Sequence, residues 1–183
     1  MEAQKLQDST LNAEVLRFGS MLREPRDFVS DFERDVAHSL VKAGLAYEYE
    51  PYKFFVEIDG RVRMFVPDFR ITNAKMGGKE IILEPHGAAF TDDYFFKKLN
   101  AFMDSKEHDS RYFVLITNMS KEEMTRRLAK LGMKLSDIAD DIWFETSTDG
   151  TVAGYLPYLE RKTQELADKA RALSNFMRRS IER

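Results

Sequence analysis

The chain of 183 residues contains no cysteine. Disulfide bonds, thiolate metal sites and cysteine nucleophiles are therefore excluded. The lack of disulfide bonds fits an intracellular protein. No stretch approaches the roughly 20 apolar residues of a membrane helix, and residues 1–5 lack the charged-then-apolar pattern of a secretory signal. We therefore expect a cytoplasmic protein without a membrane span. Internal repeats, low-complexity segments and helix-turn-helix or zinc-type recognition motifs are also missing.

Hydrophobic residues make up 43% of the chain and charged residues 32%, which is typical of a globular protein with a core. The net charge is −3, but the charge is uneven. Residues 157–183 contain seven basic and four acidic side chains, a net charge of +3, which leaves −6 for the rest. A basic C-terminal segment favours contact with phosphate groups.

The apolar patterns divide the chain into three parts. Residues 1–27 predict an N-terminal helical extension, with a helix over 9–23. Residues 28–155 predict an α/β core, and residues 156–183 predict a basic C-terminal helix. Apolar side chains recur along this last helix at steps of three and four residues, so we expect it to pack on the core or on a second copy in a homodimer. A short coiled coil is the alternative.

Within the core, local signals predict a mixed sheet with helices on its faces. Ser30 and Glu33 have the spacing of a capping box, Gly44 ends that helix, and Asp59-Gly60 predicts a hairpin. A strand, a helix capped by Thr91 and a second strand predict a parallel crossover. The expected elements are a helix from 30 to 44, strands over 47–58 and 61–72, a turn over 73–78, a strand over 79–84, a helix over 91–106, a strand over 111–117, a helix over 120–132, a short strand over 142–145 and a loop over 146–154.

Two acidic residues follow strand patterns within this core. Asp68 comes after Pro67 at the end of one apolar strand, and Glu84 ends the next, sixteen positions later. If these strands pair, the two carboxylates converge and can hold a hard cation such as Mg²⁺, with the backbone carbonyl of Pro85 as a third oxygen. A Pro-Asp turn and a solvent-facing glutamate at a strand end are the alternatives.

The runs Phe65-Val66-Pro67-Asp68-Phe69 and Ile81-Ile82-Leu83-Glu84-Pro85-His86-Gly87 resemble the PD-(D/E)xK nuclease superfamily over about residues 28–118. The resemblance implies a restriction-endonuclease-like fold and DNA cleavage that depends on Mg²⁺ or Mn²⁺. It assigns metal binding to Asp68 and Glu84, a supporting role to Glu33 on the preceding helix, and a lysine to the following helix, where Lys97 or Lys98 fits. Glu33 is equally explained by the capping box, and both lysines by a solvated helix face.

One position departs from the family pattern, because His86 stands where a lysine is usual. Neutral histidine forfeits a positive charge near phosphate, worth roughly 4 kcal/mol at 4 Å and an effective dielectric near 20. It can instead accept a proton from water or bind Mn²⁺. A plain loop residue is the alternative.

The resulting hypothesis is a DNA endonuclease in which Glu33, Asp68, Glu84, His86 and Lys97 are catalytic. We expect Lys98, Arg178 and Arg179 to contact DNA, and partner proteins to assist targeting. The alternative is a catalytically inactive module with the nuclease fold that binds nucleic acid or assembles with proteins.

Overall fold

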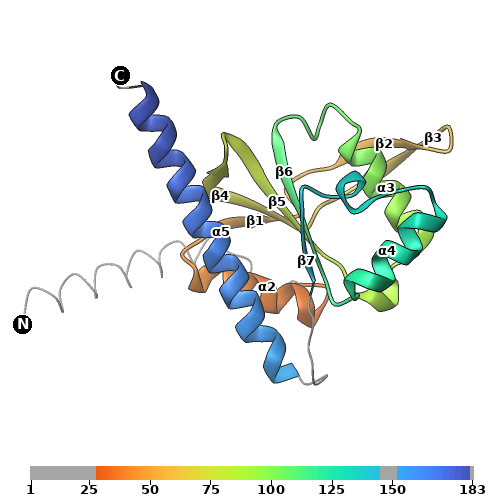
Figure 1. Cartoon of the computed structure of the whole chain (residues 1–183), viewed down its shortest axis with the longest axis horizontal. Coiled ribbons are helices and arrows are strands. Elements are labelled where there is room, and N and C mark those ends of the chain that lie inside the picture. The colour runs from red at the N-terminus through yellow and green to blue at the C-terminus, as the bar shows by residue number, and fades with distance from the viewer. Residues whose placement is uncertain (1–27, 145–151, 182–183) are drawn as a thin grey trace, which may run out of the picture.

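A computed structural model describes residues 28–144 and 152–181 (Figure 1). Within them the chain forms a five-stranded mixed sheet, a two-stranded sheet and four α-helices, of which the C-terminal one is the longest. The expected α/β class, mixed sheet and long C-terminal helix are confirmed. The elements are α2 (Asp31–Lys42), β1 (Tyr47–Tyr49), β2 (Phe54–Ile58), β3 (Arg61–Phe65), β4 (Phe69–Met76), β5 (Lys79–Pro85), the 3-10 turn η2 (Ala88–Phe90), α3 (Asp93–Met103), β6 (Arg111–Thr117), α4 (Lys121–Lys130), the 3-10 turn η3 (Leu135–Asp137), β7 (Asp141–Phe144) and α5 (Val152–Ile181).

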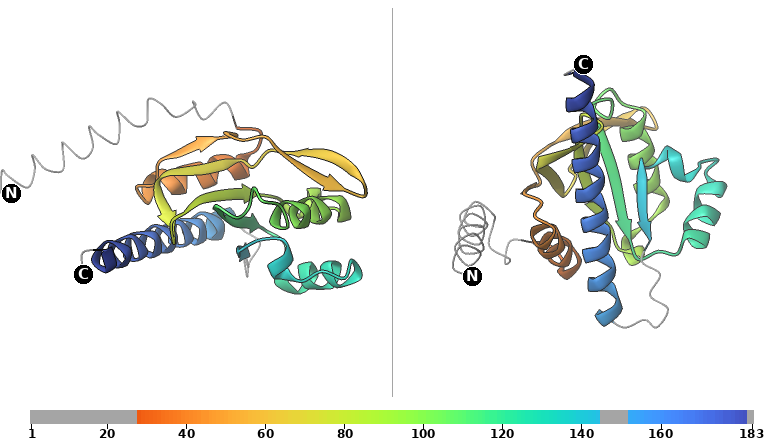
Figure 2. Two further views of the ribbon diagram at one scale, coloured as in Figure 1. Left: turned by 90° about the horizontal axis from the view of Figure 1, so that it is seen from above. Right: turned by 60° about the vertical axis from the view of Figure 1, so that its left-hand side comes forward.

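The larger sheet has the strand order β1-β4-β5-β6-β7. β4 is antiparallel to β1 and β5, whereas β6 is parallel to both β5 and β7. Since α3 connects β5 to β6, the predicted parallel crossover is confirmed. One face of the sheet packs against α2 and α5, and the other packs against α3, α4 and the β2–β3 hairpin. The right-hand view of Figure 2 shows the sheet between these two layers.

Burial on both faces explains the unbroken apolar run of β5. Ile81 and Leu83 lie in the core beneath α2 and α5, while Ile82 lies in the core beneath α3. Side chains alternate between the two faces of a strand. The same alternation directs Glu84 toward the α3 layer.

Both serine caps predicted from the sequence begin helices. The Ser30 hydroxyl accepts the N–H of Glu33 at the start of α2, and the Ser120 hydroxyl accepts the N–H of Glu123 at the start of α4. Gly44 follows α2 with φ of 72°, a conformation that glycine adopts without steric cost. These signals were predictable because they involve only neighbours along the chain.

The two predicted strands on either side of the hairpin were too long. Residues 47–58 form β1 and β2, which belong to different sheets and are separated around Pro51. Residues 61–72 likewise divide into β3 and β4, with Pro67 in the break. Proline offers no N–H to a strand partner, so the chain leaves one sheet and enters the other at these positions.

The predicted turn over 73–78 was also too long, because β4 continues through Met76 and only the two glycines turn. The Asn73 side chain accepts the N–H of Ala46 and donates to the carbonyl of Gly44. Asn73 therefore holds the segment before β1 against β4.

Two further boundaries differ from the predictions. Asp92, not Thr91, caps α3, because its carboxylate accepts the N–H of Phe95 at 2.7 Å. α5 already begins at Val152, so residues 152–154 are helical and not loop. The predicted helix over 9–23, and with it the extension over 1–27, lies outside the described residues.

α5 packs on α2 and β4, as expected for a helix that covers the core. Leu159, Leu166 and Ala170 are buried in the same cluster as Leu83. The Thr163 hydroxyl donates to a carbonyl within α5 and lies 3.1 Å from the carbonyl of Ser39 in α2. None of the described helices is both long and apolar enough to cross a membrane.

Candidate functional site

Asp68 and Glu84 lie opposite one another on neighbouring antiparallel strands. The register pairs Phe69 with Leu83, and Asp68, the residue just before β4, stands next to Glu84, the residue that follows Leu83 in β5. Cβ atoms of such pairs are about 4.5–5.5 Å apart. The backbone N–H of Asp68 also donates to Oε2 of Glu84 at 3.3 Å. The structure therefore brings together the two carboxylates on which the sequence hypothesis depends.

Both carboxylates are costly to ionise in this fold. Glu84 is only 6% exposed, and burial, followed by the nearby Asp68 charge, raises the pKa of Glu84 well above its usual range. Burial, followed by the charges of Glu33 and Glu50, raises the pKa of Asp68 to about 8. Two carboxylates that repel each other, here one buried and one half-buried, are stabilised by a cation placed between them.

Glu33 lies at the start of α2 and is largely buried. Its carboxylate accepts hydrogen bonds from the hydroxyl of Tyr49 at 2.6 Å, the hydroxyl of Ser30 at 2.9 Å and the N–H of Val29 at 3.0 Å. These donors account for its position, and its charge still acts on Asp68. The capping function and proximity to the acidic pair therefore coexist.

The two lysines of α3 point to different places. Lys97 forms an ion pair with Asp59 at the hairpin turn, with Nζ 2.8 Å from Oδ2. The charge of Lys98 instead lowers the pKa of both Asp68 and Glu84, opposing the larger effect of burial. The structure therefore associates Lys98, and not Lys97, with the acidic pair.

Lys98 reaches the acidic pair across aromatic rings. Its Nζ lies 5.4 Å from the ring centre of Phe65 and 5.5 Å from that of Phe95. Cations bind favourably to aromatic rings at such distances. The ammonium group is thereby held at the α3 side of the sheet, which is also the side that Glu84 faces.

His86 follows β5 and is fixed by its neighbours. Its ring stacks on Phe95 with centroids 3.6 Å apart, and Nε2 lies 3.3 Å from the carbonyl of Phe90. Burial, only partly offset by that carbonyl, lowers the pKa of His86, so the ring is neutral. Its backbone N–H donates to Ile116 on β6, and Pro85, one residue earlier, ends β5 beside Glu84.

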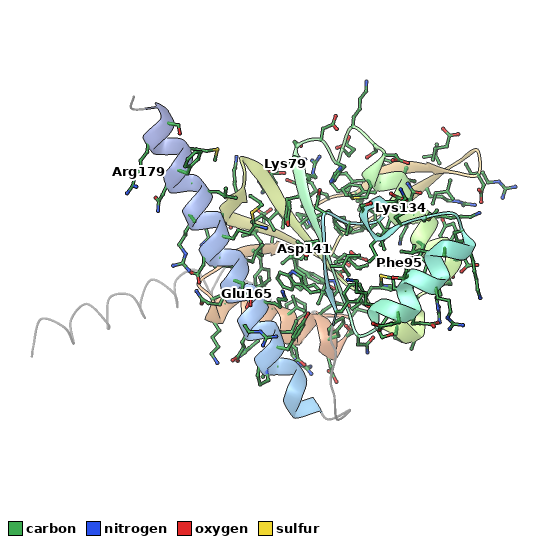
Figure 3. All side chains as sticks on the ribbon, viewed as in Figure 1. Lys79, Phe95, Lys134, Asp141, Glu165 and Arg179 are labelled. Atoms are coloured by element: carbon green, nitrogen blue, oxygen red, sulfur yellow. The ribbon has the colours of Figure 1, made fainter. Side chains whose placement is uncertain are left out.

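The predicted DNA contact Arg179 lies away from this site. Figure 3 shows Arg179 near the C-terminal end of α5 and Phe95, the stacking partner of His86, at the other side of the molecule. Arg179 is exposed. Arg178 belongs to the same turn of α5, and its side chain lies outside the described part. Arg179 is not brought together with the acidic pair.

Sequence reasoning did not identify Glu50. Its N–H donates to the carbonyl of Asp68 at 2.7 Å, and its φ of 46° is left-handed, a region that glutamate seldom adopts. No local pattern distinguishes this glutamate from an ordinary turn residue. Its proximity to Asp68 depends on the pairing of β1 with β4.

Across residues 28–144 and 152–181, no three carboxylate or imidazole groups are arranged to hold a metal ion by themselves. A cation at Asp68 and Glu84 therefore requires backbone carbonyl and water oxygens to complete its shell. Mg²⁺ commonly keeps several waters and uses one or two carboxylates. The paired, under-compensated carboxylates fit that mode of binding.

Compared with protein-family models, curated proteins and solved structures, the chain shows no match.

Proposed function

We propose that this protein is a Mg²⁺- or Mn²⁺-dependent endonuclease that hydrolyses phosphodiester bonds in DNA, with a restriction-endonuclease-like fold. The observation that carries the proposal is the proximity of Asp68 and Glu84, two carboxylates whose pKa values are raised first by burial and then by the charges of neighbouring carboxylates. The resemblance of the surrounding motifs to PD-(D/E)xK nucleases supports DNA as the substrate.

Asp68 and Glu84 would hold the cation, with the carbonyl of Pro85 as an additional oxygen. A bound divalent cation lowers the pKa of a water molecule and stabilises charge on the phosphate. Glu33 supports Asp68 from α2. Lys98 supplies positive charge toward the phosphate, in the role that the sequence hypothesis gave to Lys97.

His86 would assist the attacking water. A carbonyl only accepts hydrogen bonds, so the contact with Phe90 places the hydrogen of the neutral ring on Nε2 and leaves the lone pair on Nδ1. Water would attack phosphorus and Nδ1 would take the proton that water loses, while the bond from phosphorus to the leaving sugar oxygen would break and that oxygen would take a proton from solvent. General-base assistance of this kind is typically worth about 10²- to 10⁴-fold.

The test is cleavage of supercoiled plasmid DNA with Mg²⁺, Mn²⁺ or EDTA across a range of pH. We expect nicking by the wild type with either metal and loss of nicking in Asp68→Asn and Glu84→Gln. The matched control is Glu57→Gln, which removes an exposed carboxylate from the hairpin. Equal nicking by Asp68→Asn and Glu57→Gln contradicts the proposed site, and a parallel RNA substrate tests the choice of nucleic acid.

The second candidate is a non-catalytic module that binds nucleic acid or protein partners. It is favoured by the restraint of His86 between Phe95 and Phe90, and by the absence of a third acidic or imidazole ligand within the described residues. DNA binding in a gel-shift assay, combined with no cleavage under any metal condition, supports this candidate over the endonuclease.

A further inference from the structure

Two aromatic side chains are exposed beside the candidate metal site. Phe90 in η2 is 80% exposed and Tyr94 in the first turn of α3 is 44% exposed. A fully buried phenylalanine stabilises a fold by about 1.5–3 kcal/mol, which an exposed one forgoes. Single exposed apolar residues are common on proteins, so the position of this pair carries the argument.

Phe90 contacts the residues that follow Glu84. Its carbonyl lies 3.3 Å from Nε2 of His86, and its Cδ2 atom lies 3.6 Å from where a Cβ would stand on Gly87. The exposed ring therefore projects from η2, six residues after the glutamate of the acidic pair and in contact with the segment that follows β5.

Tyr94, the second exposed ring, lies on α3. It stands four residues before Lys98 on α3, and side chains at that spacing are neighbours on one helix face, with about 5–6 Å between their Cβ atoms. The Nζ of Lys98 in turn lies 5.5 Å from the ring centre of Phe95, the ring on which His86 stacks. Phe90 is thus next to His86, and Tyr94 is next to Lys98 on α3, with both His86 and Lys98 near the ring of Phe95.

The backbone that carries Phe90 is held in place. The N–H of Ala88 donates to Oδ1 of Asn118 at 2.6 Å, and the hydroxyl of Thr91 donates to the carbonyl of Gly87 at 3.1 Å. Arg127 on α4 donates to the carbonyl of Thr91 at 2.9 Å. The backbone around Phe90 is therefore held in a position that exposes the ring. A residue whose backbone is already ordered loses less conformational freedom on binding.

We propose that Phe90 and Tyr94 form a stacking surface for unpaired nucleobases, so that the substrate is DNA with unpaired nucleotides next to the cleaved bond. This inference rests on the proposed nuclease function. Aromatic rings stack on bases of any sequence, while the phosphate of the same nucleotide is directed to Lys98. Bases within an uninterrupted duplex offer no face to these rings.

Nearby negative charge does not oppose stacking. Asp92 and Asp93 stand at the start of α3, where the positive end of the helix dipole, about half a unit charge, offsets part of their negative charge, and Asp92 accepts the N–H of Phe95. A stacked base is uncharged. The arrangement thus favours the base at the aromatic pair and the phosphate at Lys98.

The test measures binding of the full chain in EDTA, where metal-dependent cleavage does not occur, at low salt. The probes are a labelled single strand, a duplex with a single-stranded flap and a blunt duplex, followed by fluorescence anisotropy. We expect the first two to bind at least about tenfold more tightly than the blunt duplex. Phe90→Ala should weaken single-strand binding by about 5- to 150-fold, the range of one lost base stack, and Phe90→Trp should retain it.

The matched control is Phe176→Ala, which removes a 70% exposed phenylalanine from α5. A 2-aminopurine base at the flap junction should lose fluorescence on binding to the wild type and to Phe176→Ala, but not to Phe90→Ala. Equal affinity for all three probes, or equal affinities of the Phe90→Ala and Phe176→Ala variants, overturns the inference. Because these measurements need no metal, a failure of plasmid nicking alone counts against the nuclease proposal and not against stacking.

Discussion

Replacing Asp68 by asparagine should stabilise the metal-free protein at alkaline pH. In the unfolded chain this carboxyl ionises near its ordinary pKa of 3.8, whereas the fold raises its pKa to about 8, chiefly through burial. The folded state therefore binds more protons between these values, and the free energy of unfolding falls as pH rises from about 4 to about 8. Asparagine keeps the shape of the side chain and carries no charge to bury.

The size of the effect follows from the pKa difference. Each pKa unit corresponds to about 1.36 kcal/mol, so the full difference between 3.8 and about 8 corresponds to about 6 kcal/mol. Asp68 is only half-buried, and screening by water reduces the realised gain to about 2–3 kcal/mol. For a chain of this size that gain raises Tm by about 4–12 °C.

The assay is thermal unfolding followed by circular dichroism at pH 5 and pH 8 in EDTA. Asp68→Asn should exceed the wild type at pH 8, with a smaller difference at pH 5, while the control Glu57→Gln should follow the wild type at both. Adding Mn²⁺ should stabilise the wild type by about 2.7 kcal/mol at one hundred times Kd and leave Asp68→Asn unchanged. A Tm for Asp68→Asn at or below that of the wild type at pH 8 in EDTA would refute the reasoning.

Two further predictions concern α3 and the hairpin. Lys98→Met should reduce metal-dependent nicking of plasmid DNA, because it removes the positive charge that the proposal directs to the phosphate; Lys97→Met, which loses only the exposed pair with Asp59, should nick normally. Gly60→Ala should destabilise the protein by about 1–2 kcal/mol in urea unfolding, because Gly60 has φ of 72°, while Gly60→Asn should lose less; equal stability of all three proteins would contradict this account of the turn.

The parts of the fold predicted correctly are those coded by neighbouring residues. The hairpin turn is one example, since Asp59 and Gly60 both have positive φ, as an Asp-Gly turn requires. The serine caps of α2 and α4 are others. In each case the deciding interaction lies within a few residues of the signal, so the sequence alone contains it.

Strand register could not be predicted in this way. Near the site Phe69 pairs with Leu83, but beyond a bulge between Ile71 and Lys75 the partner of Lys75 is Glu80. A slip of one residue would move every side chain of β4 to the opposite face. The convergence of the acidic pair was therefore a hypothesis that depended on contacts between distant residues.

Which of Lys97 and Lys98 lies nearer the acidic pair could not be predicted for a related reason. Adjacent residues on a helix differ by about 100° in direction, so only one of the two can face the acidic pair. The sequence shows that α3 has an inner face, marked by Phe95 and Leu99, but not which strand lies beside each edge of that face. The pair between Lys97 and Asp59 forms because the hairpin folds over α3.

The departure at His86 acquires a physical interpretation from this geometry. A lysine at that position would bring a positive charge, whereas the pocket formed with Phe95 and the Phe90 carbonyl holds a neutral imidazole with its lone pair on Nδ1. Positive charge comes instead from Lys98, one turn along α3 from Phe95. We infer that charge and proton acceptance, which a single lysine combines in the resembled family, are divided here between two residues that contact the same phenylalanine ring. A lysine placed at 86 would lose the ring stack and bring a second cation near Lys98, so His86→Lys should not raise activity.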